Sequence, residues 1–87
     1  MKRKTFRAEV RDLGSWDLIG ERDTFAWNSA IRATEAIVRE FARRPGVGAC
    51  VGSRPEVIED ESDRIYGRTW TTPSGREVRA LVWEVAA

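Results

Sequence analysis

The sequence predicts an α+β fold in which one helix packs on one face of an antiparallel sheet of three to four strands. Three patterns support this fold class: apolar residues alternate over 5–12, they recur at helical spacing over 27–41, and two β-rich segments flank a Pro-Ser-Gly turn near the end. The 87 residues contain no stretch that reads as a linker, so we expect a single domain over 1–87.

The first strand is expected over residues 5–12, where apolar and charged side chains alternate. Gly14-Ser15 then favours a two-residue hairpin turn. That tight register sets Asp12 opposite Asp17, a pair of like charges, so a looser connection is equally open. A second strand is expected within 16–27.

The helix shows the most regular pattern in the chain. Its apolar stripe recurs every three or four residues and consists of Trp27, Ala30, Ile31, Thr34, Ile37, Val38 and Phe41. Asn28 and Ser29 are good N-caps and predict where the helix begins, and Pro45-Gly46 ends it.

The helix also carries charged residues at a spacing that favours ion pairs. Glu35 and Arg39 are four residues apart, as are Glu40 and Arg44. Side chains at this spacing are neighbours on a helix surface, so the helix arginines have an explanation that needs no ligand.

The end of the chain is predicted to form a hairpin whose register can be counted from its loop. With Pro73-Ser74-Gly75 as the loop, Thr72 faces Arg76. One face then pairs Trp70 with Val78, Arg68 with Ala80 and Tyr66 with Val82, and we assign it to the core. The other face carries Thr71 with Glu77, Thr69 with Arg79, Gly67 with Leu81 and Ile65 with Trp83.

This second face is the candidate site for a protein partner, because a single helix covers one face of a sheet. Trp83, Ile65 and Leu81 are the expected apolar anchors, Arg79 the ion-pair donor at the rim, and Trp16 an anchor from a loop. Two alternatives stay open. In the first, residues 45–63, which form either a short strand or a loop, fold over this face and bury it. In the second, a register slip of one residue exchanges the two faces.

Composition limits the chemistry that the chain can perform. There is no His and one Cys, which excludes Ser–His and Cys–His nucleophile pairs and a Cys/His metal cluster. The carboxylates of the run after Pro55 are expected to be solvated, and Cys50 is expected to be a buried, inert thiol. We therefore expect a non-enzymatic protein without cofactor or metal.

Basic residues gather in the first segment and give a second hypothesis. The formal net charge is +1, which does not favour strong nonspecific binding to nucleic acid. These basic residues form either a local basic patch that binds nucleic-acid phosphates, which is the alternative site, or an ordinary charged end that keeps an edge strand from aggregating. They are Lys2, Arg3, Lys4, Arg7 and Arg11.

The chain shows no stretch long and apolar enough to span a membrane, and no apolar segment follows its basic start. We therefore expect a cytoplasmic protein without membrane contact. An edge strand and an apolar patch would also suit a homodimer.

The order of elements resembles that of small phage-encoded accessory proteins of the anti-CRISPR type. The segments that carry the resemblance are Phe6–Val10, Trp27–Phe41 and Trp70–Trp83, which together cover most of the chain. The resemblance implies a non-enzymatic inhibitor that occludes a site on a larger host complex. It rests on a pattern of elements, so it transfers no functional residue.

Overall fold

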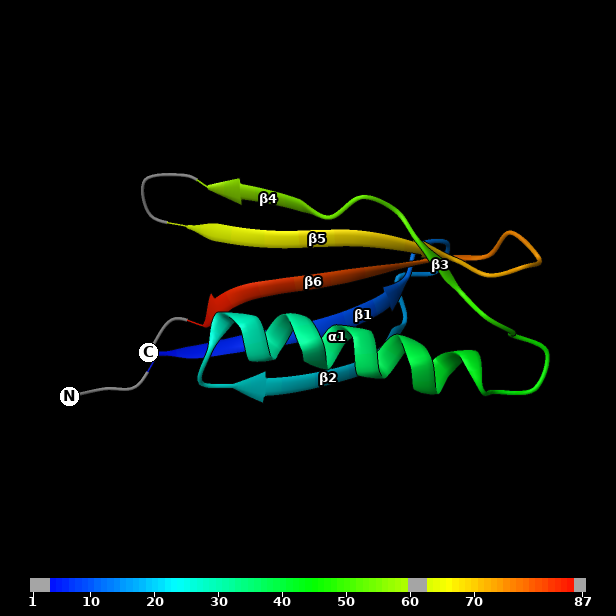
Figure 1. Ribbon diagram of the computed structural model, residues 1–87, viewed down its shortest axis with the longest axis horizontal. Coiled ribbons are helices and arrows are strands. Elements are labelled where there is room, and N and C mark those ends of the chain that lie inside the picture. Colours follow the sequence, from blue (N-terminus) through cyan, green and yellow to red (C-terminus); the bar gives the residue numbers. More distant parts are fainter. Residues whose placement is uncertain (1–3, 60–62, 86–87) are drawn as a thin grey trace.

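Figure 1 shows the computed structural model, in which a helix lies across one face of a sheet; the structure describes residues 4–59 and 63–85. The elements in chain order are β1 (Thr5–Asp12), β2 (Leu18–Thr24), α1 (Trp27–Ala42), β3 (Val51–Gly52), β4 (Glu56–Glu59), β5 (Arg64–Thr71) and β6 (Glu77–Val85). The antiparallel strands follow the order β2-β1-β6-β5-β3, and β4 also pairs with β5. The α+β class with one helix on the sheet is confirmed, but the described residues form six strands rather than three or four.

The connection from β1 to β2 is looser than a two-residue turn. The two strands are separated by residues 13–17, and the backbone N–H of Asp12 donates to the carbonyl of Asp17 at 3.0 Å. The carboxylate of Asp12 accepts hydrogen bonds from the backbone N–H groups of Gly14 and Ser15, at 2.8 and 3.1 Å. Asp12 therefore still lies opposite Asp17, and the backbone of the turn stabilises the charge of Asp12.

α1 begins earlier than the predicted N-caps Asn28 and Ser29. The residue before the helix is Ala26, which is extended (φ −141°, ψ 140°) and provides no side-chain hydrogen bond as a cap. The ring of Trp27 packs edge-on against Phe6, with centroids 5.9 Å apart. This contact holds Trp27 against β1 as the first helical residue, so packing outweighs the preference for a capping side chain.

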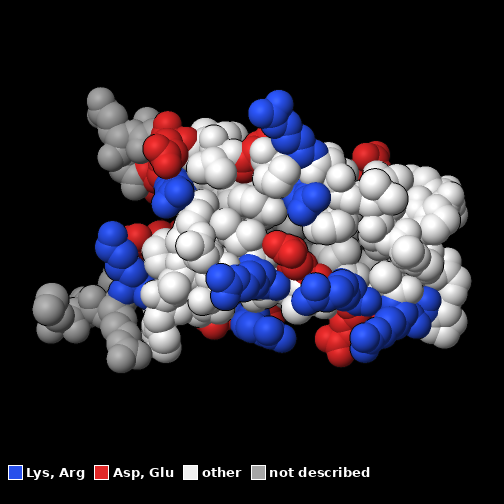
Figure 2. Space-filling model, viewed as in Figure 1, with Lys and Arg blue, Asp and Glu red and all other residues white. Residues whose placement is uncertain are grey.

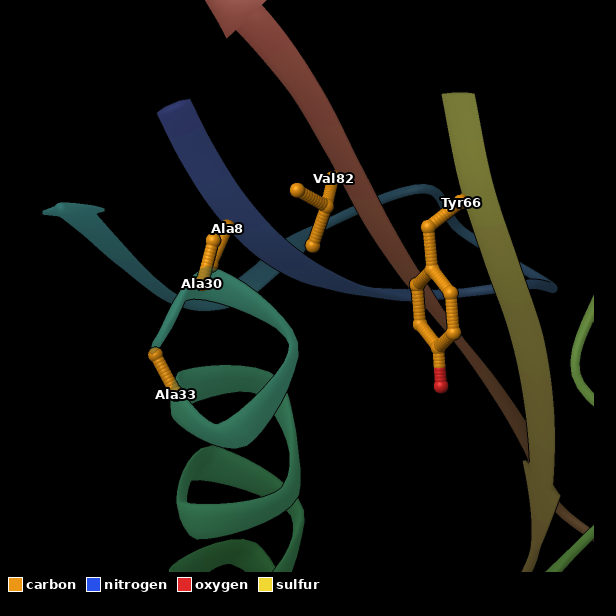
Figure 3. Close-up of a cluster of buried hydrophobic side chains, with 5 residues drawn as sticks. All are labelled: Ala8, Ala30, Ala33, Tyr66 and Val82. Carbon is orange, nitrogen blue, oxygen red and sulfur yellow. The ribbon is translucent and has the colours of Figure 1, made fainter. Parts of the chain in front are cut away.

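Small residues let α1 lie close to the sheet. Figure 3 shows Ala30 and Ala33 of α1 beside Ala8 of β1 and Val82 of β6, with the ring of Tyr66 extending from β5. A second buried cluster continues the core toward the other end of the helix and contains Val10, Val38, Phe41, Val78 and Ala80. The predicted apolar stripe of the helix is confirmed as its core-facing side.

α1 runs over β1, β2 and β6 (Figure 1). Its approach to β2 depends on Gly20, where a Cβ would stand 2.7 Å from Cγ2 of Ile37. A side chain at Gly20 would push the helix away from the edge strand.

The expected ion pairs along α1 do not form. Neither Glu35 with Arg39 nor Glu40 with Arg44 comes within 4.0 Å in the described part of the chain. The guanidinium of Arg44 instead lies 5.5 Å from the ring centroid of Phe41. Exposed pairs of this kind contribute only about 0.3–0.5 kcal/mol, so a competing contact decides the side-chain position.

The β5–β6 hairpin has the predicted register. The N–H of Thr72 donates to the carbonyl of Arg76 at 2.8 Å, and Tyr66 pairs with Val82 and Ile65 with Trp83. Gly75 closes the loop with φ +92°, a conformation that residues with a side chain rarely adopt. The register slip left open above is therefore excluded for this hairpin.

The described part of 45–63, residues 45–59 and 63, does not fold over the second face of the sheet. It forms β3 and β4, which pair with β5 and widen the sheet at its edge. Among the described elements, the helix covers one face and no element covers the other, which we call the open face.

Candidate interaction surface on the open face

The open face presents its apolar residues in one row across neighbouring strands. Ile58 of β4 pairs with Ile65 of β5, and Ile65 pairs with Trp83 of β6. Leu81 lies in the adjacent row, opposite Gly67. Because paired residues in an antiparallel sheet project to the same side, these side chains form a continuous apolar patch.

Exposure increases along this row toward the sheet edge. Trp83 and Leu81 are half-buried, Ile65 is 39% exposed and Ile58 is 62% exposed. The patch therefore offers a partly buried aromatic ring at its inner end and free aliphatic surface at the sheet edge, a combination typical of a docking surface.

Arg79 is held in place beside the patch. Its Nη1 donates to the Thr69 hydroxyl at 2.9 Å, and its Nη2 lies 3.5 Å from a carboxylate oxygen of Glu56. The guanidinium lies over Gly67, where even a Cβ would collide with it. The absence of a side chain at Gly67 thus lets Arg79 lie flat on the sheet, next to Leu81.

Charged pairs border the patch on its other side. Arg7, which pairs with Trp83 across the ladder, makes two hydrogen bonds to Asp23, at 2.9 and 3.3 Å. The hydrogen bond from Arg7 lowers the pKa of Asp23. Arg11 donates to the buried carboxylate of Glu9 at 2.9 Å.

Trp16 lies apart from the other predicted anchors. It belongs to the β1–β2 connection, has φ 64° and is 48% exposed. Its carbonyl accepts a hydrogen bond from Arg11, whose guanidinium carbon lies 5.7 Å from the indole centroid. Arg11 is four residues along β1 from the partner of Trp83, or about 13 Å. Trp16 therefore stands at the far end of the open face.

The structure adds Ile58 and Glu56 to the candidate site. The sequence predicts a solvated Glu56 and indicates no role for Ile58, whereas pairing with β5 brings Ile58 beside Ile65 and Glu56 beside Arg79. The signal available in the sequence is the apolar pair Val57-Ile58 between two glutamates, which fits a short edge strand.

The basic residues of the alternative site are engaged by carboxylates where the structure describes them. Lys4 lies 3.8 Å from Glu84, Arg7 binds Asp23 and Arg11 binds Glu9. Lys2 and Arg3 lie outside the described residues. Nucleic acid bound at β1 would have to compete with these carboxylates, and its use of this strand stays a prediction.

Over 4–59 and 63–85, no three His, Cys, Asp or Glu residues are grouped as a metal site needs. Burial raises the pKa of the Tyr66 phenol and of the Cys50 thiol. No described helix is long and apolar enough to cross a membrane.

Neither a known protein family, nor a curated protein, nor a solved structure matches this chain.

Proposed function

We propose that the chain is a non-enzymatic binding module that docks a protein partner on its open face. The observation that carries the proposal is the row Ile58–Ile65–Trp83, which lies in adjacent register positions on a face that no described element covers. An uncovered apolar row of this kind loses water when a partner binds, and that loss of contact with water is the main source of affinity.

The surroundings of the row indicate what the partner presents. The patch is bordered by Arg7 with Asp23 beside Trp83 and by Arg79 with Glu56 beside Leu81. This arrangement of an aromatic anchor within a rim of both charges is typical of specific protein interfaces. The partner surface is expected to be apolar at its centre and to carry polar groups of both signs around it.

Occlusion of a functional site on a larger complex is the mode of action that we favour. Inhibition by occlusion requires a docking face and no catalytic group, which agrees with the resemblance to small phage-encoded inhibitors. A cytoplasmic location belongs to the same proposal, since host complexes of this kind act there.

Two neighbouring residues of β4 provide a matched test. Ile58 projects to the open face and Val57 to the helix side, and both are exposed, at 62% and 48%. Wild type, Ile58→Arg and Val57→Arg are each used to capture proteins from extracts of candidate hosts. We expect wild type and Val57→Arg to retain one shared partner that Ile58→Arg and Trp83→Ala lose.

Size-exclusion chromatography with light scattering of the same variants tests whether a second copy is the partner. Dimers that Ile58→Arg abolishes would identify the open face as a homodimer interface. If both β4 variants retain every captured protein equally, the open face is not the docking surface and the proposal fails.

A further inference from the structure

A second surface lies on the opposite side of the sheet, between α1 and the edge strand β2. It is a groove of about 410 Å³ whose lining includes Arg22 from β2 and Arg32 and Arg39 from α1. The small side chains Ala33 and Ala36 also line it. Figure 2, viewed from the helix side, shows basic side chains gathered along this part of the molecule.

The arginines of this groove form no ion pair in the part of the chain that the structure describes. Within residues 4–59 and 63–85, Arg22, Arg32, Arg39 and the nearby Arg43 make no ion pair within 4.0 Å. This contrasts with Arg7 on the open face, which is bound by Asp23.

The arginines of β2 and α1 lie on the same side of the sheet, the side that carries the helix. Arg22 pairs with Ala8 of β1, which is buried beneath the helix, so its side chain projects on the helix side of the sheet. Arg32 and Arg39 are seven residues apart and therefore lie within about 20° of one line along the helix. They span about 10 Å of the helix axis.

The negative groups near this line are few. Glu35 and Glu40 share the helix with the arginines, and no acidic residue stands in its first turn. On β2, Glu21 and Asp23 pair with Glu9 and Arg7, which places them on the open face. The groove therefore has an excess of positive charge although the whole chain is nearly neutral.

We propose that this groove binds the phosphate backbone of double-stranded DNA. Guanidinium groups match phosphate oxygens in geometry as well as charge. Over the roughly 10 Å from Arg32 to Arg39 a duplex carries about six phosphate charges, since it has about one per 1.7 Å. None of the lining residues is aromatic or a large apolar anchor, so the groove lacks stacking platforms for single strands and hot spots for a protein. The contacts are to the backbone, which predicts binding without sequence preference.

The test measures fluorescence anisotropy of a labelled duplex of mixed sequence, and of its single strand, across a range of salt concentrations. The variant Arg22→Gln/Arg32→Gln/Arg39→Gln removes three groove charges. The control Arg7→Gln/Arg11→Gln removes charge from the open face and also tests the alternative site on β1. Circular dichroism melting of each variant establishes that it is folded at the temperature used.

We expect wild type to bind the duplex with an affinity that falls steeply with salt. The groove variant should bind at least tenfold more weakly, with a slope of log affinity against log salt that is shallower by about 2–3. The open-face control should keep most of the wild-type affinity and slope.

Four results would overturn the proposal. They are no duplex binding at low salt, loss of binding in the open-face control but not in the groove variant, tighter binding of the single strand than of the duplex, and tighter binding of polyglutamate than of the duplex at equal charge. The last result would assign the groove to acidic protein segments. Loss of binding in the open-face control would place the DNA on β1 instead of in the groove. None of the four results changes the capture test of Ile58 and Val57, so this inference and the proposed function fail independently.

Discussion

Asp12 and Arg76 are 64 positions apart in the sequence, yet Nε of Arg76 donates a hydrogen bond to Oδ2 of Asp12 at 2.6 Å. Asp12 ends β1, and Arg76 follows the loop of the β5–β6 hairpin. Beside them, the backbone N–H of Leu13 donates to the carbonyl of Glu77 at 3.0 Å. These bonds join the two hairpin connections at one end of the sheet, so that β1 and β6 are fixed in register there.

This contact predicts how stability depends on pH. The hydrogen bond from Arg76, followed by those from the N–H groups of Ser15 and Gly14, lowers the pKa of Asp12 below its value in an unfolded chain. The ionised carboxylate therefore stabilises the fold above the unfolded pKa of about 3.9. That contribution is lost as the pH falls through the lower folded pKa.

We expect Asp12→Asn to be less stable than wild type at neutral pH, with a difference that shrinks as the pH falls below about 4. Urea denaturation at a series of pH values measures it. Asp17→Asn is a control, because Asp17 lies in the same connection and makes no bond to Arg76. A difference that stays constant over the whole range would show that the charge of Asp12 contributes nothing.

The close approach of Gly20 and Ile37 predicts an energetic coupling between β2 and α1. A methyl group at Gly20 would meet Cγ2 of Ile37 at 2.7 Å, so Gly20→Ala should destabilise the fold by about 1–3 kcal/mol. Ile37→Ala removes the obstructing atoms and carries its own cost. The double variant should lose less folding free energy than the sum of the losses of the two single variants. Denaturant unfolding of wild type, both single variants and the double variant measures this. Additive losses would mean that the helix moves freely away from Gly20.

Local patterns sufficed for β1, α1 and the β5–β6 hairpin. The alternation over Phe6–Val10 and the Pro73-Ser74-Gly75 loop determine side-chain direction and register from neighbouring residues alone. β4 was missed because residues 56–59 contain two glutamates and become a strand only through pairing with β5. The helix start was missed because the contact between Trp27 and Phe6 overrides the capping preference.

The candidate site followed from the same register. Counting from the hairpin loop placed Ile65, Leu81, Trp83 and Arg79 on one face, as the structure does. The position of Trp16 depends on a backbone angle, φ 64°, that no residue pattern indicates. The sequence also could not show which helix arginines form ion pairs. A spacing of four residues shows that an ion pair can form, but not that it does form.

Val82 and Trp83 are neighbours on β6 that project to opposite faces of the sheet. Substituting each of them therefore distinguishes an effect on folding stability from an effect on partner binding. Val82 is fully buried beneath the helix, so Val82→Ala should cost about 2 kcal/mol of folding free energy. Trp83 projects to the open face, and Trp83→Ala should weaken partner binding by more than about 2 kcal/mol while the chain stays folded. Thermal melts and binding titrations of both variants check this. An unfolded Trp83→Ala variant would make Trp83 a structural residue and remove it from the site.

Cys50 is predicted to react slowly. It packs against the second core cluster, its Sγ lies 3.7 Å from the carbonyl of Gly48, and burial raises the pKa of its thiol. Since the thiolate is the reactive form, a raised pKa leaves less of it at any pH than in the unfolded chain, whose thiol has a pKa of about 8.5. The rate of alkylation by iodoacetamide should therefore rise with pH, and the midpoint of this rise should lie above that value in the folded protein. In urea-unfolded protein the midpoint should lie at about 8.5. A midpoint in the folded protein at or below that of the unfolded protein would instead reveal an activated thiol, and the inert role expected for Cys50 would be wrong.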